Sequence, residues 1–255
     1  MFGTSIIEPK VEDKLTHNGG VLTNIMLKLV MDNIVGSPIV ISKFEARKWS
    51  QNKLNLELTK DQFSLIVGSL LGDGTMRIGQ GAINANFKVE HGLMQKDLVI
   101  SKYEILKPWV LTKPKISYRY NIDGSKYEKS WWFRTVRHSK LTEIRKTFYP
   151  NGKKIIPQAI DVWLSTPALA WWIMDDGCYS KSKIDISTYS FALAEVERLL
   201  KLINHKFSVT GKYFKDRDKG FRMYFNTTET KRLVDLIEPY VIDSMRYKIG
   251  YSRTP

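Results

Sequence analysis

The chain carries one sequence pattern twice, and this repeat is the strongest constraint on its fold. Residues 63–79 read FSLIVGSLLGDGTMRIG, and residues 168–183 read ALAWWIMDDGCYSKSK. Each stretch is an apolar run that ends in an acidic residue and a glycine, and then continues with a short polar segment. Asp73 and Asp176 are the equivalent acids. Repetition of this kind indicates two copies of one structural unit.

The segments that follow each acid are repeated as well. Both copies continue with alternating polar and apolar residues, a pattern typical of half-buried antiparallel strands, and then with a helical segment. A second alternating stretch follows at residues 115–138 and 211–227, and a third helical segment at residues 139–150 and 229–241. The sequence therefore predicts an α+β fold built from two pseudo-symmetric αββαββα repeats.

The repeat also divides the chain into three parts. We expect an N-terminal extension at residues 1–56, partly irregular because its first part lacks clear periodicity. The first repeat is expected at residues 57–154 and the second at residues 155–255.

Charge and residue types narrow the class of partner. The chain has 40 Lys and Arg against 26 Asp and Glu, a net charge of +14 that favours nucleic acid or an anionic membrane as partner. Its longest apolar runs, about ten residues, are too short to cross a bilayer. The single cysteine, Cys178, excludes an intramolecular disulfide and a cysteine zinc site. No histidine pair has zinc spacing, so His91 and His138 are expected to be structural. We expect a soluble protein in a reducing compartment.

The two acids stand where helix electrostatics disfavours them. If each apolar run is a helix, its acid lies at the negative end of the helix dipole. Two copies of one unit tend to associate about a pseudo-twofold axis, which would bring Asp73 and Asp176 together. Neighbouring carboxylates repel, and a divalent cation such as Mg²⁺ compensates both. The alternative is that each Asp-Gly pair is only a helix stop. Two copies in a basic, duplicated chain favour the metal site.

The motif copies IVGSLLGDG, at residues 66–74, and LAWWIMDDG, at residues 169–177, carry a family resemblance. The chain resembles the single-chain, two-motif LAGLIDADG homing endonucleases over residues 58–250. It departs from the family pattern at Trp171, where a small residue often stands, and at Leu71 and Met174, which replace the first acid of the motif. These departures bear on how closely the two helices cross and leave the final acids intact.

The resemblance implies two four-stranded antiparallel sheets that form a saddle over the major groove of DNA. It implies that Asp73 and Asp176 bind a divalent cation and direct phosphodiester hydrolysis, with Mg²⁺ expected and Mn²⁺ as a possible substitute. Metal-assisted hydrolysis suits this role because a cation activates water and stabilises the attacking and leaving oxygens. Asymmetry between the halves predicts a long, asymmetric duplex target and a protein that acts as a monomer.

The resemblance also implies supporting roles for the neighbouring residues. Gly72 and Asp175 would contribute backbone carbonyls to the metal, and Lys154 and Lys248 match catalytic lysines near the end of each half. An ordinary solvated or phosphate-positioning lysine is the alternative at either place. A strand pair fits the major groove, where basic side chains can read bases. The basic residues expected to contact DNA from the strands are Lys88, Arg119, Arg134, Lys183, Lys212 and Arg222.

Several functions fit this fold and charge. The first is a homing endonuclease that cleaves both DNA strands and promotes mobility of its host intron. The alternatives are an RNA maturase that assists intron splicing, and a DNA-binding regulator on the same fold. Retention of both acids favours the nuclease, since a pure binder has no need for repelling carboxylates. An intein is disfavoured because the chain starts with Met-Phe and ends without Asn. The resemblance, together with the missing targeting signal, implies synthesis inside a mitochondrion or chloroplast.

Overall fold

The computed structural model describes residues 55–252, and residues 56–255 form one compact unit. The expected N-terminal extension, residues 1–56, therefore lies almost entirely outside the described residues. No helix within residues 55–252 has the length and apolarity that a bilayer crossing requires.

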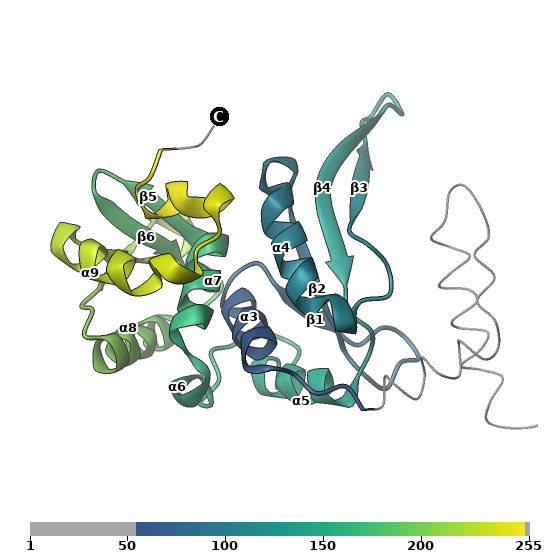
Figure 1. The fold of residues 1–255 in the computed structure, drawn as a ribbon, viewed down its shortest axis with the longest axis horizontal. Helices are drawn as coiled ribbons and strands as arrows, with labels where there is room; N and C mark the ends of the chain where they lie inside the picture. The colour runs from purple at the N-terminus through teal and green to yellow at the C-terminus, as the bar shows by residue number, and fades with distance from the viewer. Residues whose placement is uncertain (1–54, 253–255) are drawn as a thin grey trace, which may run out of the picture. The chain divides into compact units, whose positions relative to one another are not determined.

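Each half contains its helices and strands in the predicted order (Figure 1). The first half consists of α3 (Lys60–Leu71), β1 (Thr75–Arg77), β2 (Asn86–Gly92), α4 (Lys96–Leu106), β3 (Lys115–Tyr120), β4 (Lys126–Arg134) and α5 (Ser139–Phe148). The second half consists of α7 (Thr166–Asp176), β5 (Gly177–Ser180), β6 (Lys183–Ser187), α8 (Leu193–Phe207), β7 (Lys212–Lys215), β8 (Phe221–Phe225) and α9 (Thr227–Ile237). The predicted fold class is confirmed.

Short helical segments that the sequence pattern did not predict complete the described chain. One α-helical turn, α6 (Ile160–Trp163), joins the two halves. The 3-10 helices are η1 (Leu93–Gln95), η2 (Lys107–Trp109), η3 (Arg217–Lys219), η4 (Glu238–Tyr240) and η5 (Asp243–Ile249).

The two sheets share one topology. Both are four-stranded and antiparallel, with strand order β1-β2-β4-β3 in the first half and β5-β6-β8-β7 in the second. The register repeats as well. Thr75, two residues after the first acid, pairs with Lys88, and Cys178, two residues after the second acid, pairs with Asp185. Lys88 and Asp185 are therefore equivalent positions of the two repeats.

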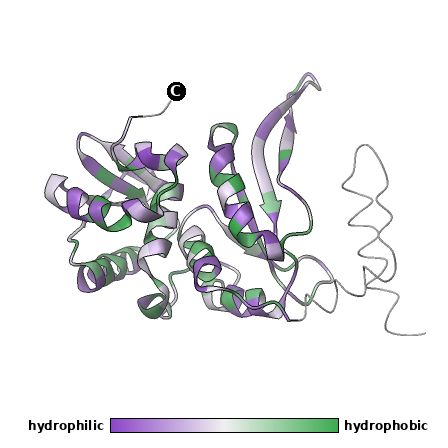
Figure 2. Cartoon of the chain, viewed as in Figure 1, coloured by the Kyte–Doolittle hydropathy of each residue, from purple (hydrophilic) through white to green (hydrophobic). Residues whose placement is uncertain are grey.

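The sheets bury one face, as their alternating sequences predict. Phe87 and Val89 of β2, like Ile184 and Ile186 of β6, are at most 1% exposed. Helix α4 packs on β2 and β4, while α8 and α9 contact β8. Figure 2 shows hydrophobic stretches on the packed helices and mostly hydrophilic residues along the outer part of the β3–β4 hairpin. The opposite face of each sheet carries the polar, less buried side chains of these strands.

The first helix of each half is fixed at its start by a side-chain cap. Thr59 and Gln62 form a reciprocal capping box at the start of α3. Ser165 caps α7 by accepting a hydrogen bond from the backbone amide of Ala168. The hydroxyl groups of Ser64 and Ser165 lie 2.9 Å apart and join the two helix starts. Both helices are buried on nearly every side, which is typical of central elements.

Helices α3 and α7 pack against each other at close range, because glycines of α3 face larger residues of α7 (Figure 1). A Cβ on Gly68 would overlap the carbonyl oxygen of Ala168 and lie 2.8 Å from the Cβ of Trp171. A Cβ on Gly72 would lie 2.6 Å from the Cβ of Asp175. The large Trp171 therefore does not prevent a close helix crossing, because Gly68 provides the space.

Candidate active site

The helix packing brings the two predicted acids to one end of the α3–α7 seam. Asp73 follows Gly72, which ends α3, and Asp176 is the last residue of α7. The side chain of Asp73 is 49% exposed, whereas Asp176 is half-buried. The acids thus lie at the junction of the halves, where each helix passes into the first strand of its sheet.

The two acids have opposite electrostatic surroundings. Burial raises the pKa of Asp176 to about 7, and the negative charges of Asp73 and Asp175 add to this effect. Burial also raises the pKa of Asp73, but contact with His91 and the positive charges of Lys102 and Lys248 outweigh it, so the net pKa of Asp73 is lowered. Without a cation, Asp73 is ionised and Asp176 is partly protonated near neutral pH.

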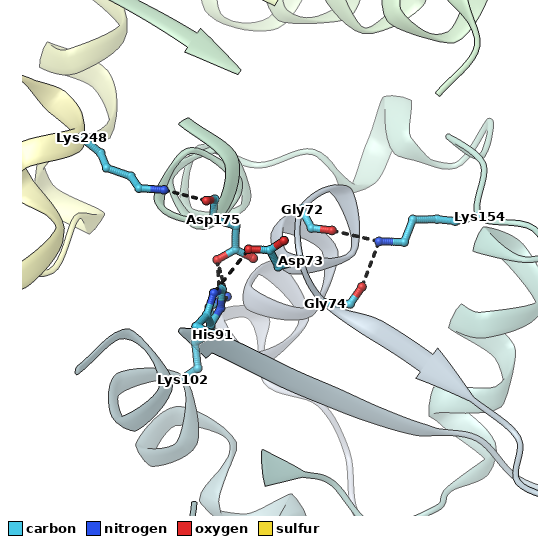
Figure 3. A network of polar contacts seen from close by, with 8 residues as sticks. All are labelled: Gly72, Asp73, Gly74, His91, Lys102, Lys154, Asp175 and Lys248. Atoms are coloured by element: carbon cyan, nitrogen blue, oxygen red, sulfur yellow. Dashed lines mark hydrogen bonds and ion pairs between the residues drawn. The ribbon is translucent and has the colours of Figure 1, made fainter. Parts of the chain in front are cut away.

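Two lysines cap the helix ends from opposite sides (Figure 3). Lys154 donates hydrogen bonds of 2.9 Å to the carbonyl oxygens of both Gly72 and Gly74. Lys248 donates a 2.6 Å hydrogen bond to the carbonyl oxygen of Asp175. Burial lowers the pKa of both lysines, although the nearby acids oppose the shift. The predicted acids, carbonyls and lysines therefore come together at one place.

The oxygen donors at this seam fit a hard divalent cation. Burial and the neighbouring charge of Asp73 together raise the pKa of Asp176, and the carbonyl oxygens of Gly72 and Asp175 belong to the residues immediately before the two acids. Each carbonyl oxygen already accepts a lysine hydrogen bond but keeps a second lone pair. Among residues 55–252, no group of three or more His, Cys, Asp or Glu side chains could hold a metal ion. An incomplete oxygen set suits Mg²⁺, which commonly takes one or two carboxylates and completes its shell with phosphate and water.

Two side chains at this site were not predicted from the sequence. His91 was expected to be structural, yet its Nδ1 lies 3.4 Å from Oδ2 of Asp73 and its side chain is 1% exposed. Lys102 is fully buried, and its Nζ lies 2.5 Å from Oδ1 of Asp175. The expectation that His91 is structural stays a prediction, since a buried ring beside Asp73 can serve a structural role. His138 agrees with its expected structural role, because its Nδ1 accepts a hydrogen bond from the backbone amide of Lys140 at the start of α5.

The sequence did hold a signal for Lys102. Leu98, Val99, Tyr103 and Leu106 form the buried face of α4, and Lys102 falls on that face by helical spacing. A lysine on an apolar stripe calls for a buried partner, since an unpaired buried charge is costly. A comparable signal marks His91, because strand alternation places it after Phe87 and Val89 on the buried face of β2.

The six basic residues predicted to contact DNA all lie on sheet strands. Lys88 pairs with Arg134 in the register of β2 and β4, on the side opposite the buried Val89 and Phe133. Arg119, Arg134, Lys183 and Lys212 are exposed. The side chain of Arg222 is only 20% exposed, and its guanidinium lies 3.8 Å from the carboxylates of Asp185 and Asp216. Their contacts with DNA stay predictions.

One acid shares the basic face of the first sheet. Glu90 accepts hydrogen bonds from Lys88 at 2.5 Å, Ser130 at 2.6 Å and Lys129 at 3.0 Å. Burial opposes ionisation of Glu90, but these hydrogen bonds and the charge of Lys88 lower its pKa to about 2. A pocket of about 420 Å³ opens here, and Asp73 is among the residues that line it. The acid at the seam is therefore continuous with the basic sheet face.

Comparison with known proteins agrees with this architecture. The sequence pattern of the LAGLIDADG DNA endonuclease family matches residues 63–233. The cytochrome b mRNA maturase bI2 of Debaryomyces hansenii is 30% identical over 200 residues, which cover 77% of this chain and 76% of that protein. The DNA endonuclease I-ChuI of Chlamydomonas applanata is 29% identical over 211 residues, covering 76% of this chain and 97% of that protein.

A solved structure shares the fold at lower sequence identity. The homing endonuclease I-WcaI, bound to its DNA recognition sequence, superposes with a TM-score of 0.74 at 23% identity. The match covers 84% of this chain and 96% of that chain. The resemblance that the two motifs predicted is confirmed, and the chain belongs to the LAGLIDADG DNA endonuclease family.

Proposed function

We propose that the protein is a site-specific homing endonuclease that hydrolyses both strands of a long, asymmetric DNA duplex. The observation that carries this proposal is the pairing of Asp73 and Asp176 at the α3–α7 seam, where burial and mutual repulsion raise the pKa of Asp176 to about 7. Three carbonyl oxygens that accept hydrogen bonds from Lys154 or Lys248 flank the acids. The relative named DNA endonuclease I-ChuI supports the same activity.

The acids, carbonyls and lysines at the seam would have different roles in the reaction. Asp73 and Asp176 would hold a divalent cation, proposed to be Mg²⁺ with Mn²⁺ as a substitute, together with the carbonyl oxygens of Gly72 and Asp175. When bound, such a cation would supply the positive charge that activates water and stabilises the attacking and leaving oxygens of the phosphodiester. Lys154 and Lys248 fix these carbonyls through their hydrogen bonds.

The same lysines would also bring positive charge to the phosphate. Because their pKa values are lowered, Lys154 and Lys248 exchange protons with water near neutral pH more readily than an exposed lysine does. Because both lysines reach their carbonyls from equivalent positions, each half supplies the parts for cutting one strand.

Target recognition is proposed to come from the polar faces of the two sheets. A strand pair fits the major groove, where Lys and Arg can hydrogen-bond to guanine. The halves present different side chains at equivalent positions, such as Lys88 against Asp185. A protein of two unlike halves would read an asymmetric site as a monomer. We assign residues 57–154 to the half that reads one side of the site and residues 155–255 to the other.

Selection from a randomised duplex library tests this proposal. With Mg²⁺, the protein should release cleaved duplexes that share one long asymmetric sequence, and chelation of the metal should prevent cleavage. Mn²⁺ should replace Mg²⁺. Failure of the folded protein to cut any duplex with either metal would overturn the proposal.

A maturase role is the second candidate, because two of the relatives are named cytochrome b mRNA maturases. Both roles fit a host intron, and we propose that the protein works in the organelle that carries this intron. Asp176→Asn separates the two functions. Host-intron splicing that continues with this variant, alongside lost DNA cleavage, would assign splicing to a surface other than the acid pair. A DNA-binding regulator is disfavoured because both acids are retained.

A further inference from the structure

A buried ion pair adjoins the acid pair, and the proposed hydrolysis does not itself require it. The carboxylate of Asp175 and the ammonium group of Lys102 are both 0% exposed and lie 2.5 Å apart. Asp175 belongs to the second half, at the end of α7, whereas Lys102 comes from α4 of the first half. Burying two charges costs several kcal/mol per ion. A pair of this kind therefore calls for an explanation beyond packing.

The position of the Asp175 carboxylate depends on Gly72 across the seam. A Cβ at Gly72 would lie 3.0 Å from Oδ2 of Asp175. Glycine thus leaves the room in which the carboxylate turns toward the first half (Figure 3). Gly72 and Asp175 are equivalent positions of the two repeats, each immediately before one of the two acids. The first half therefore has a glycine that leaves space where the second half has a carboxylate.

His91 connects this buried pair to Asp73. Its Nε2 lies 3.3 Å from Nζ of Lys102 and 3.5 Å from Oδ1 of Asp175. Its Nδ1 lies 3.4 Å from Oδ2 of Asp73. The imidazole therefore stands between the buried pair and the exposed acid, and its rotation is restricted because its side chain is 1% exposed.

The second half has no equivalent of this arrangement. The sheet registers make Thr188 the counterpart of His91, and the matching buried faces of α4 and α8 make Leu199 the counterpart of Lys102. The hydroxyl of Thr188 donates its hydrogen bond to the carbonyl oxygen of Phe221, and Leu199 is apolar and fully buried. Asp176 thus lacks the support that Asp73 receives.

We propose that Lys102, His91 and the Asp175 carboxylate form a positioning network for Asp73, which makes the two cleavage centres unequal. The inference rests on the proposed endonuclease function. Lys102 fixes the Asp175 carboxylate, both groups fix the imidazole, and the imidazole fixes the Asp73 carboxylate. Each centre consists of one of the two acids and the lysine of the same half, and the shared cation lies between the acids. Loss of the network should impair the centre of Asp73 more than that of Asp176, so one DNA strand should be cut more slowly.

The test measures each strand separately, on a selected duplex with a different label at the end of each strand. His91→Phe keeps a ring but removes the nitrogen that faces Asp73, and Lys102→Met removes the ammonium group. Both variants should slow cleavage of the same strand by about tenfold or more, a typical effect for groups that support metal ligands, and leave the other strand within about threefold. Nicked duplex should accumulate. His91→Asn, which offers an amide N–H near the position of Nδ1, should restore part of the rate.

Matched controls separate positioning from general damage. Thr188→Val changes the position equivalent to His91, and Lys107→Met removes an exposed lysine that follows α4; neither should slow one strand selectively. A second readout is chemical unfolding without metal. The double variant Lys102→Met/Asp175→Leu replaces the ion pair with apolar groups of similar shape, and it should regain the unfolding midpoint that Lys102→Met loses while one strand remains slow.

The outcomes are distinguishable. Equal slowing of both strands in His91→Phe and Lys102→Met would overturn the positioning network, as would full recovery of both strand rates in the double variant. Wild-type protein that cuts neither strand of any duplex would instead overturn the proposed function, and this inference with it.

Discussion

Asp176→Asn is expected to stop DNA cleavage and, at the same time, to stabilise the metal-free protein above neutral pH. The variant removes one of the two carboxylates proposed to hold the cation. Loss of such a ligand removes several kcal/mol of transition-state stabilisation, which slows cleavage by about three orders of magnitude. Stability should rise because burial and the charges of Asp73 and Asp175 oppose ionisation of this side chain.

The direction of the pH dependence follows from the raised pKa. The pKa of Asp176 moves from 3.8 to about 7 on folding, so its ionisation opposes folding. Stability is fully present below pH 3.8 and falls as pH rises through about 7. Relative to Asp176→Asn, the metal-free wild type should lose roughly 2–3 kcal/mol of unfolding free energy between about pH 5 and about pH 8.

Urea unfolding in the presence of a chelator, at both pH values, provides the measurement. The exposed Asp235 serves as the matched control, since Asp235→Asn should follow the wild type at every pH. Addition of Mg²⁺ at the higher pH should stabilise the wild type and leave Asp176→Asn unchanged. Parallel pH curves for the wild type and Asp176→Asn would show that folding does not raise the pKa of Asp176.

Lys102→Met is expected to be among the most destabilising single substitutions in the described part of the chain. Removal of the ammonium group leaves the carboxylate of Asp175 fully buried and without its partner at 2.5 Å. Breaking a buried ion pair from one side typically costs about 3–5 kcal/mol. The nearby Lys107 has a similar pair with Glu104, at 2.9 Å, but both side chains are more than half exposed. Lys107→Met should change stability by less than about 1 kcal/mol.

A double-mutant cycle separates the pair from the cost of an orphaned charge. Asp175→Leu alone leaves Lys102 buried and unpaired, and should also destabilise the protein. Combining it with Lys102→Met should recover most of the loss, because apolar groups of similar volume often replace buried ion pairs without penalty. Unfolding free energies that simply add in the double variant would contradict a direct interaction between the two groups.

Much of the fold was readable from the sequence because local pattern and repeat agreed. Alternation at Phe87 and Val89, and again at Ile184 and Ile186, predicted the buried sheet faces that the structure contains. Helical spacing predicted part of the buried face of α8, at Val196, Leu199 and Ile203, but not the buried Leu202. The repeat strengthened each prediction, because two different sequences independently indicated the same order of helices and strands.

The site was only partly readable, because its remaining contacts cross between the halves. Equivalent positions led to Asp73 and Asp176, and the structure brings Lys154 and Lys248 to the adjoining carbonyls. For Asp175, the sequence predicted a role for the backbone carbonyl and none for the side-chain carboxylate. Its contact with Lys102 arises from the space above Gly72, on another helix, and no single segment encodes that space.

The departure at Trp171 shows the same limit. By its size alone, a tryptophan at this position of α7 is expected to affect how closely the two helices approach. In the folded chain Gly68 of α3 faces Trp171, so the pair retains a close crossing. Complementary size across a seam is a property of two segments, and the sequence of one cannot give it.

The central claim is that Asp73 and Asp176 share a divalent cation at the junction of the halves. The most direct measurement is the anomalous diffraction of Mn²⁺ in crystals of the protein bound to its selected duplex. We predict a metal peak within bonding distance of both carboxylates and of a phosphate of the cleaved step. Separated acids, with metal bound elsewhere or not at all, would contradict the account.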